Sequence, residues 1–169
     1  MKKLLDSILK TAVDSILKSP DAVLFSENIE ETVYNKFKIE LPSLVKEELK
    51  IDIGEEIIGF GNAPDGINFT PGQPMEFALF LIPVKGSKEL FKIIVSPFVS
   101  DRKIGFDGHY LIYKEFTGRK ITGNDSEIQK VKESARSKIA IVESRLRTLE
   151  KDIEAFYETS LRPTIHQTI

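Results

Sequence analysis

The chain has no cysteine and only two histidines among its 169 residues, and neither sign of charge is in marked excess. Without cysteine it cannot form disulfide bonds, thiolate zinc sites, iron–sulfur clusters or a cysteine nucleophile, because each of these requires a cysteine thiol or thiolate. Lysine and arginine number 24 against 26 aspartates and glutamates, which gives a net charge of −2. The chain therefore lacks the basic field that binds phosphate backbones, and we expect no nucleic-acid partner.

Long hydrophobic runs are also missing. Lys2 and Lys3 precede Leu4 and Leu5 at the amino terminus, but Asp6 interrupts the apolar run that a signal peptide needs. No window approaches about eighteen uncharged residues, the length of a membrane span, so we expect no membrane partner. These absences predict a cytoplasmic protein.

What the sequence does contain is the composition of one globular domain, with 41% hydrophobic and 30% charged residues. The spacing of apolar residues changes from a helical to a strand period near residue 51, and back again near residue 124. We therefore predict an α+β fold in a single domain over residues 1–169. It has a helical segment (1–50), an antiparallel sheet (51–123) and a long amphipathic helix (124–162).

Prolines divide the helical segment. Apolar residues at four-residue spacing predict a first helix that ends before Pro20. Ser26, followed by acidic residues, predicts the amino-terminal cap of a second helix that reaches about Lys38. Pro42 suits the first turn of a third, short helix from Ser43 to Lys50.

Four runs of residues are expected to form the four-stranded antiparallel sheet, over about residues 51–122, because no helical crossover is predicted between them. The second run is apolar on both faces, which is the pattern of a covered or central strand. A turn at residues 85–88 makes a hairpin of the second and third runs. The predicted strands are Ile57–Phe60, Met75–Val84, Leu90–Ser96 and Ile104–Phe116, and Ile121 adds a stub.

A loop over residues 61–74 joins the first two predicted strands, and it contains three glycines and three prolines. Loops of this length are often functional. The stretch from Gly59 to Pro64 partly matches the glycine spacing of a dinucleotide-binding turn. It lacks the third glycine, because Pro64 occupies that position, and no helix is predicted to follow it. The sequence therefore predicts no cofactor, but the loop suggests a small-molecule-sensing domain in which it closes over a ligand.

Acid–base chemistry at neutral pH has one candidate centre. Asp107, His109 and Glu115 share one face of the predicted strand Ile104–Phe116, and a carboxylate beside an imidazole is the minimum for a general base or, with Glu115, for a metal site. The competing interpretation is a strand whose polar face meets water and whose apolar face meets the core. We favour the second, because no nucleophile motif accompanies the histidine, and we predict no catalytic or metal-binding residue.

The carboxy-terminal helix carries the strongest pattern. In a heptad register, eight of its ten seam positions are apolar, which is typical of a coiled coil. A helix over residues 125–162 would measure about 57 Å at about 1.5 Å per residue, longer than a compact domain of this size, roughly 40 Å across. We predict self-association through the following residues: Leu146, Leu149, Ile153 and Phe156 in the seam, with Lys138 facing Glu143 and Arg145 facing Glu150 across a parallel pair.

The apolar spacing of this helix continues past Pro163 to the last residue, Ile169, without a helix stop signal. That pattern is typical of the amino-terminal part of a longer protein, or of a short frayed tail.

Three hypotheses for the function follow from the sequence. The first is a non-catalytic protein-interaction or oligomerisation module. The second is a small hydrolase or metal-assisted enzyme centred on Asp107, His109 and Glu115, and the third is the small-molecule-sensing domain with the 61–74 loop. Polar groups that converge in one pocket would favour the second or third, and scattered polar groups the first.

Overall fold

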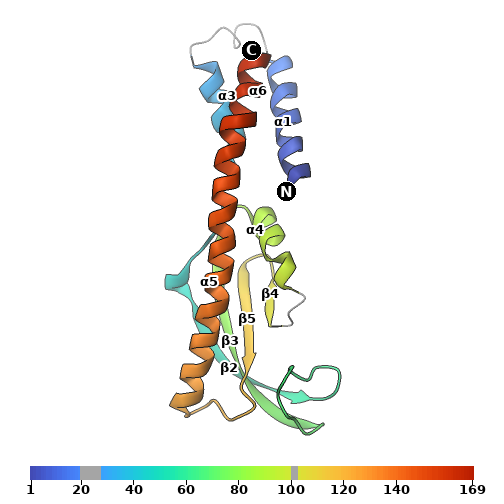
Figure 1. Cartoon of the computed structure of the whole chain (residues 1–169), viewed down its shortest axis with the longest axis vertical. Coiled ribbons are helices and arrows are strands. Elements are labelled where there is room, and N and C mark those ends of the chain that lie inside the picture. The colour runs from blue at the N-terminus through green and yellow to red at the C-terminus, as the bar shows by residue number, and fades with distance from the viewer. Residues whose placement is uncertain (20–27, 100–102) are drawn as a thin grey trace. The chain divides into compact units, whose positions relative to one another are not determined.

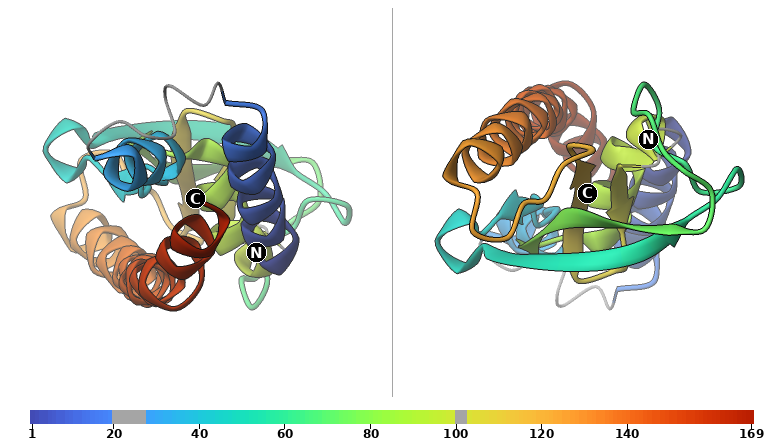
Figure 2. Two further views of the ribbon diagram at one scale, coloured as in Figure 1. Left: turned by 90° about the horizontal axis from the view of Figure 1, so that it is seen from above. Right: turned by 90° about the horizontal axis from the view of Figure 1, so that it is seen from below.

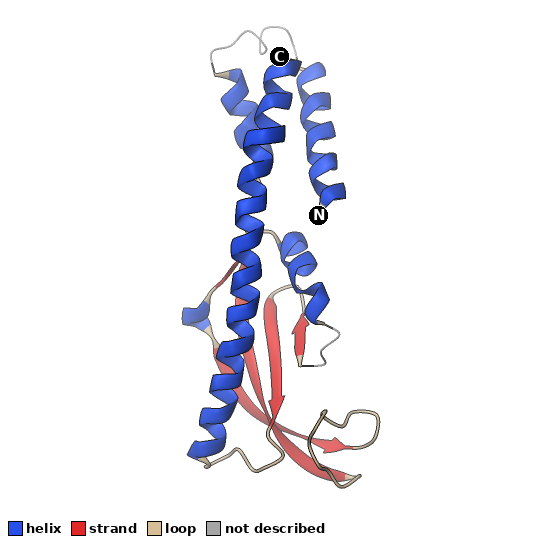
Figure 3. Cartoon of the chain, viewed as in Figure 1, coloured by secondary structure: helices blue, strands red, loops and turns tan. Residues whose placement is uncertain are grey.

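The structure is a computed structural model, and it describes residues 1–19, 28–99 and 103–169. In it the chain divides into two compact units. We call Met1–Leu41 with Arg147–Ile169 the helical unit and Pro42–Leu146 the sheet unit. The fold is the predicted α+β class, with amino-terminal helices, an antiparallel sheet and a long carboxy-terminal helix (Figures 1 and 3). The apolar spacing changes near residues 51 and 124, whereas the units divide after Leu41 and after Leu146.

The helical unit contains two predicted helices, α1 (Lys2–Leu17) and α3 (Ile29–Phe37), together with the end of the long helix α5 (Asp125–Phe156). The cap expected at Ser26 lies outside the described residues. Tyr157 closes this unit, because its hydroxyl accepts a hydrogen bond from the Ile39 N–H at 2.6 Å and donates one to the Ile39 carbonyl at 3.2 Å. The helices are thus joined by a polar contact as well as by apolar packing.

The long carboxy-terminal helix is present as predicted, and its helical structure continues beyond Pro163. A π-helical turn (Tyr157–Leu161) follows α5, and a further helix, α6 (Arg162–Thr168), continues the chain. Proline lacks an N–H and clashes with the preceding turn inside a helix, but the first turn of a helix does not need that donor. Pro163 lies in this first turn of α6, after the π turn has interrupted the α-helical ladder.

The described residues of the sheet unit form five strands, all paired antiparallel. β1 and β2 pair with one edge of β3, and β5 pairs with the other edge. β4 pairs with the remaining edge of β5. The elements in chain order are β1 (Ser43–Leu44), a 3₁₀ turn (Lys46–Glu48), β2 (Lys50–Ile58), β3 (Gln73–Lys85), α4 (Lys88–Val95), a second 3₁₀ turn (Ser96–Phe98), β4 (Ile104–Phe106), β5 (Tyr110–Phe116) and α5.

One face of the sheet is covered and forms the core of the sheet unit. We call it the core face and the opposite one the outer face. Apolar residues of β3 and β5 pack on the core face against α5, which crosses it, and against α4. The cluster contains Ala78, Phe80, Ile82, Val84, Phe91, Val95, Ile104, Leu111, Tyr113, Ile121, Val131, Ala135 and Val142.

Two predicted elements have the wrong secondary structure. Residues 43–50 form β1 and a 3₁₀ turn rather than a third helix, because the Val45 N–H bonds the Pro83 carbonyl of β3 at 2.9 Å. The predicted strand Leu90–Ser96 is the helix α4 instead. The Ser87 side chain caps it by accepting from the Leu90 N–H at 3.3 Å, and the buried residues of α4 follow a helical spacing.

The predicted strand Ile104–Phe116 is in fact two strands, β4 and β5, joined by a turn at Asp107–His109. Gly108 has a φ of +96° there, a left-handed conformation that glycine adopts without strain. Ile121 does not form a strand stub: its N–H and that of Thr122 bond the Glu76 carboxylate, the latter at 2.9 Å. These backbone donors, Thr122 first and then Ile121, lower the pKa of Glu76 below its ordinary value.

Candidate functional site

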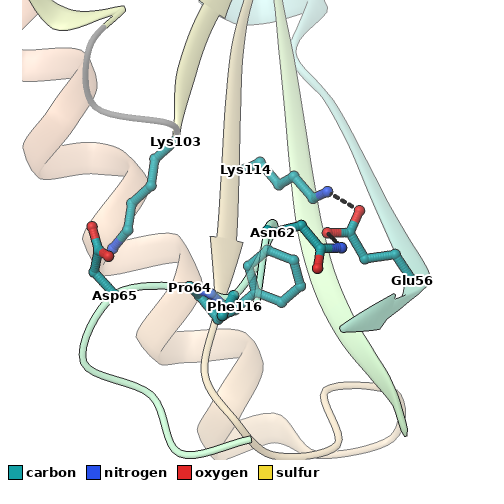
Figure 4. A pocket seen from close by; sticks show the side chains of 9 residues that line it. Glu56, Asn62, Pro64, Asp65, Lys103, Lys114 and Phe116 are labelled. Atoms are coloured by element: carbon teal, nitrogen blue, oxygen red, sulfur yellow. Dashed lines mark hydrogen bonds and ion pairs between the residues drawn. The ribbon is translucent and has the colours of Figure 1, made fainter. Parts of the chain in front are cut away.

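A pocket of about 240 Å³ lies in the sheet unit beside the loop that follows β2 (Figure 4). β2 contributes Glu56, β5 contributes Lys114 and Phe116, and Lys103 comes from the residue just before β4. Directly paired residues of antiparallel strands share a face, and β5 pairs Lys114 with Leu79 and Phe116 with Phe77, so this pocket lies on the outer face. The loop residues that complete it are Gly61, Asn62, Ala63, Pro64 and Asp65.

Lys114 is held in place by two aromatic rings and a carboxylate. Its Nζ lies 4.0 Å from the centre of the Phe77 ring and 5.0 Å from that of Phe116, and it forms an ion pair with Glu56. Phe77 and Phe116 contact each other edge to face, with ring centres 5.6 Å apart. Phe77 also lies over Gly54, its partner across the strands, where an added Cβ would overlap the ring. The ammonium group therefore has a defined position in the pocket.

The loop is closed at its base by polar contacts. Asn62 Oδ1 accepts from the Gly59 N–H at 2.7 Å, and Asn62 Nδ2 donates to the Ile57 carbonyl at 2.9 Å. The Gly72 N–H bonds the Ile58 carbonyl at 2.8 Å at the far end of the loop. These contacts position residues 61–65 as a wall of the pocket.

The charges around the pocket are balanced. Two carboxylates, Glu56 and Asp65, and two ammonium groups, Lys103 and Lys114, line it. Figure 4 shows Lys103 and Asp65 pointing toward one another, and on the other side Lys114 pointing toward Glu56. Positive and negative groups are therefore both present on each side of the pocket.

Glu115 lies on the core face, where it is 8% exposed. Its carboxylate accepts from the Tyr113 hydroxyl, from Ser134 Oγ at 3.0 Å and from Lys103 Nζ at 3.0 Å. Lys103 thus joins this buried cluster to the pocket. A buried carboxylate that accepts from three donors is satisfied by hydrogen bonds, which fits a structural role that connects β5 with α5.

The predicted grouping of Asp107, His109 and Glu115 is wrong. Asp107 and His109 lie exposed in the turn before β5, whereas Glu115 is buried, six residues or roughly 20 Å of strand beyond His109. From the sequence, the polar face of this strand was expected to be exposed to solvent. In the structure α5 covers that face, and Ser134 of α5 donates a hydrogen bond to Glu115. Among residues 1–19, 28–99 and 103–169, no group of three metal-binding side chains is arranged to hold a metal ion.

Asp107 organises the turn instead. Its Oδ1 accepts from the Tyr110 N–H at 2.7 Å and from the His109 N–H at 2.8 Å. These two backbone donors, Tyr110 first, lower the pKa of Asp107 below its ordinary value of 3.8. Asp107 is typical of an aspartate whose side chain stabilises a turn by accepting hydrogen bonds from the backbone of the residues that follow it.

We expect Asp107→Ala to lower the free energy of unfolding by about 1 kcal/mol at pH 7, because two hydrogen bonds to an exposed carboxylate are lost. The folded-state pKa is depressed, so this contribution is complete above pH 3.8 and disappears as the pH falls through the folded-state value. Urea unfolding at a series of pH values should show the wild type and the variant converging in acid. Asp107→Asn, which keeps an acceptor oxygen, and His109→Ala should both cost less than the alanine variant at neutral pH, and an equal cost for His109→Ala would contradict this role.

The residues predicted to join two copies through the long helix have neighbours within the chain. Leu149 and Ile153 are 1% and 0% exposed, and Phe156 is also buried. Leu146 packs against the core of the sheet unit. Glu143 forms an ion pair with Lys46 at 2.8 Å, and the Arg145 guanidinium lies 5.9 Å from the Phe98 ring. Lys138 is half-buried and Glu150 is exposed. A second copy is therefore not needed to bury the apolar seam, and self-association stays a prediction.

The sequence singled out the loop of this pocket but not its charged side chains. Lys103, Lys114 and Glu56 lie on three separate segments. The antiparallel pairing of β2 and β5 with β3, and of β4 with β5, brings these segments together. A lysine two residues before Phe116 in the same strand, as at Lys114, was the one available signal. The alternation of polar and apolar residues alone does not predict which face of such a strand is exposed to solvent and which is covered by another element.

No family model, curated protein or solved structure matches the chain. In the described parts of the chain, no helix combines the length and apolar composition needed to cross a membrane.

Proposed function

We propose that this chain is a non-catalytic binding domain whose outer-face pocket takes a small zwitterionic molecule of the amino-acid class. The observation that carries the proposal is the convergence of two ammonium groups and two carboxylates with an aromatic ring in one pocket walled by residues 61–65. Convergence in one pocket favours a ligand-binding function over scattered surface polarity.

Charge and size select the class of ligand. An anion would meet Glu56 and Asp65, and a cation would meet Lys103 and Lys114, whereas a zwitterion can offer each group its opposite charge. A volume of about 240 Å³ equals roughly eight water molecules at about 30 Å³ each. That is less than the roughly 300–1,000 Å³ of sites for drug-sized ligands, and it suits a small metabolite better than a nucleotide cofactor.

The pocket also has an apolar side. Phe116, Ala63 and Pro64 line it, so a ligand with an apolar side chain would remove that surface from water. We therefore propose amino acids with aromatic or aliphatic side chains, with the carboxylate toward the lysines and the ammonium group toward Glu56 and Asp65.

A protein-interaction module, the first hypothesis from the sequence, is less well supported as the role of the long helix. Leu149, Ile153 and Phe156 are buried within the chain, so an interface there would have to use other side chains. This is why the proposal rests on the pocket.

Binding of L-phenylalanine and L-leucine by calorimetry tests the proposal, with phenethylamine and 3-phenylpropanoate as analogues that each lack one charge. We expect a zwitterion to bind at least tenfold more tightly than either analogue, a difference of about 1.4 kcal/mol or more. Lys114→Met and Asp65→Asn should each weaken binding by a similar factor, and Lys92→Met, an exposed lysine on α4, should not. Amide chemical shifts should move at residues 61–65. No binding by any of the twenty amino acids, or equal binding of an analogue, would refute the proposal.

A further inference from the structure

The strand β2 lies at the margin of the sheet, and within the described residues it pairs only with β3 (Figure 2). Every second residue of such an edge strand directs its N–H and C=O groups away from the sheet, where they can pair with another strand. Natural proteins usually protect long edges with prolines, bulges or charged residues. β2 runs for nine residues, Lys50–Ile58, and contains no proline.

Three isoleucines on β2 are exposed to an extent unusual for their type. Ile51, Ile53 and Ile57 are 44%, 42% and 60% exposed. Ile51 pairs with Phe80 and Ile53 with Ala78, so they lie on the core face and extend it past the margin of the sheet. Ile51 also borders a groove of about 200 Å³ that is mostly apolar. The groove is lined as well by Leu49, Phe80, Lys132, Ala135, Arg136 and Ile139.

We propose that β2 pairs antiparallel with β2 of a second copy of this chain, about a twofold axis at Ile53. Backbone hydrogen bonds between the two strands require outward-facing residues to oppose one another, which restricts the register to steps of two residues. Each permitted register can be ranked by the charges it brings together, because directly opposite side chains in a sheet interact most strongly.

The register centred on Ile53 brings opposite charges together over seven residues of β2, 50–56, whereas the register centred on Ile51 also opposes Lys50 to an acidic residue but pairs only residues 50–52. The register centred on Ile53 places Lys50 opposite Glu56 of the second copy, twice by symmetry. Moving the centre one residue toward the amino terminus opposes Asp52 to Asp52 of the second copy. Moving it one residue the other way opposes Asp52 to Glu56 of the second copy. Both neighbouring registers thus pair like charges, which selects the central one.

The groups that this register needs are accessible. Lys50 is exposed, and its Nζ lies 6.0 Å from the Tyr110 ring on the outer face. Lys114 holds Glu56 Oε2, while Oε1 lies 3.5 Å from Asn62 Nδ2, longer than the usual 2.7–3.2 Å or so of such bonds. This oxygen can therefore accept from Lys50 of the second copy. On the core face, Ile53 would meet Ile53 of the second copy and lie diagonally beside Ile51 of that copy.

The absence of cysteine makes the register directly testable by cross-linking. Opposite residues of an antiparallel pair have Cα atoms about 4.5–5.5 Å apart, within the roughly 4.4–6.8 Å that a disulfide bridges. Ile53→Cys should give a covalent dimer under mild oxidation. Ile57→Cys is the matched control, because in this register its two copies lie roughly 27 Å apart. A dimer from both variants, or from Ile57→Cys alone, would overturn the register.

Sedimentation of the full chain from low to high micromolar concentration tests the association itself. We expect a reversible dimer that Ile53→Asp weakens at least tenfold, whereas Ile141→Asp, a change at a similarly exposed position of α5, leaves it intact. Lys50→Glu should also weaken it tenfold, and Lys50→Glu with Glu56→Lys should restore it. Circular dichroism confirms that each variant is folded. A wild type that stays monomeric, dissociation by Ile141→Asp instead, or a double variant no better than Lys50→Glu would overturn the proposal.

Discussion

Replacing Leu149 by aspartate is expected to lower the free energy of unfolding by more than about 4 kcal/mol. Leu149 is 1% exposed in the isolated chain, so the variant loses a large buried side chain, which alone costs about 2–5 kcal/mol. The carboxylate that replaces it must also leave water without a partner prepared for it, which adds to the cost. Because Leu149 belongs to the helical unit, loss of helix should be the main signal.

Urea unfolding followed by circular dichroism measures this loss. Ala155→Asp is the matched control: it introduces the same charged side chain into α5 at an exposed position, and it should cost less than about 1 kcal/mol. The competing outcome is informative as well. A Leu149→Asp variant that keeps its stability but loses self-association in sedimentation would show that this residue faces a partner, as the heptad pattern predicted.

Phe80→Ala is expected to cost about 3–5 kcal/mol through lost burial and the cavity left behind. Phe80 is 1% exposed on the core face, where its ring centre lies 5.9 Å from that of Tyr113. The substitution therefore removes a contact between the two central strands as well as apolar surface. Its effect should appear in the sheet unit, to which both residues belong.

The same unfolding experiment includes an internal comparison. Phe60 is 85% exposed, so Phe60→Ala should change stability by less than about 1 kcal/mol even though the side chain removed is identical. The tyrosine signal in the near-ultraviolet circular dichroism should be lost earlier in denaturant for Phe80→Ala. A loss below about 1 kcal/mol for Phe80→Ala would mean that β3 is not a central strand.

Local sequence patterns were sufficient where one element is long and strongly periodic. The alternation in residues 75–84 predicted β3, and the apolar stripe with its polar cap near Asn124 predicted the start of the long helix. Short elements were harder, because the run from Leu90 contains too few residues to separate a helical from a strand period. There the Ser87 cap decided in favour of α4.

Part of the candidate site could be predicted in the same way. Glycines and prolines identified the 61–74 loop, because these residues interrupt both helix and strand periods. The charged groups opposite it could not be predicted, since Glu56, Lys103 and Lys114 are brought together only by strand pairing. Sequence spacing does not encode such pairing directly.

By itself, the sequence determined the α+β class, the long carboxy-terminal helix and the exclusion of cysteine chemistry, because composition and period are local properties of the chain. The tertiary structure alone decided which faces are buried. Alternation places Glu115 on one face of β5 but cannot say that α5 covers that face. A heptad pattern indicates that one side of a helix is buried, but it does not say against what. Leu149 and Ile153 are buried within their own chain. Burial depends on what packs against a surface, and that neighbour is distant in sequence.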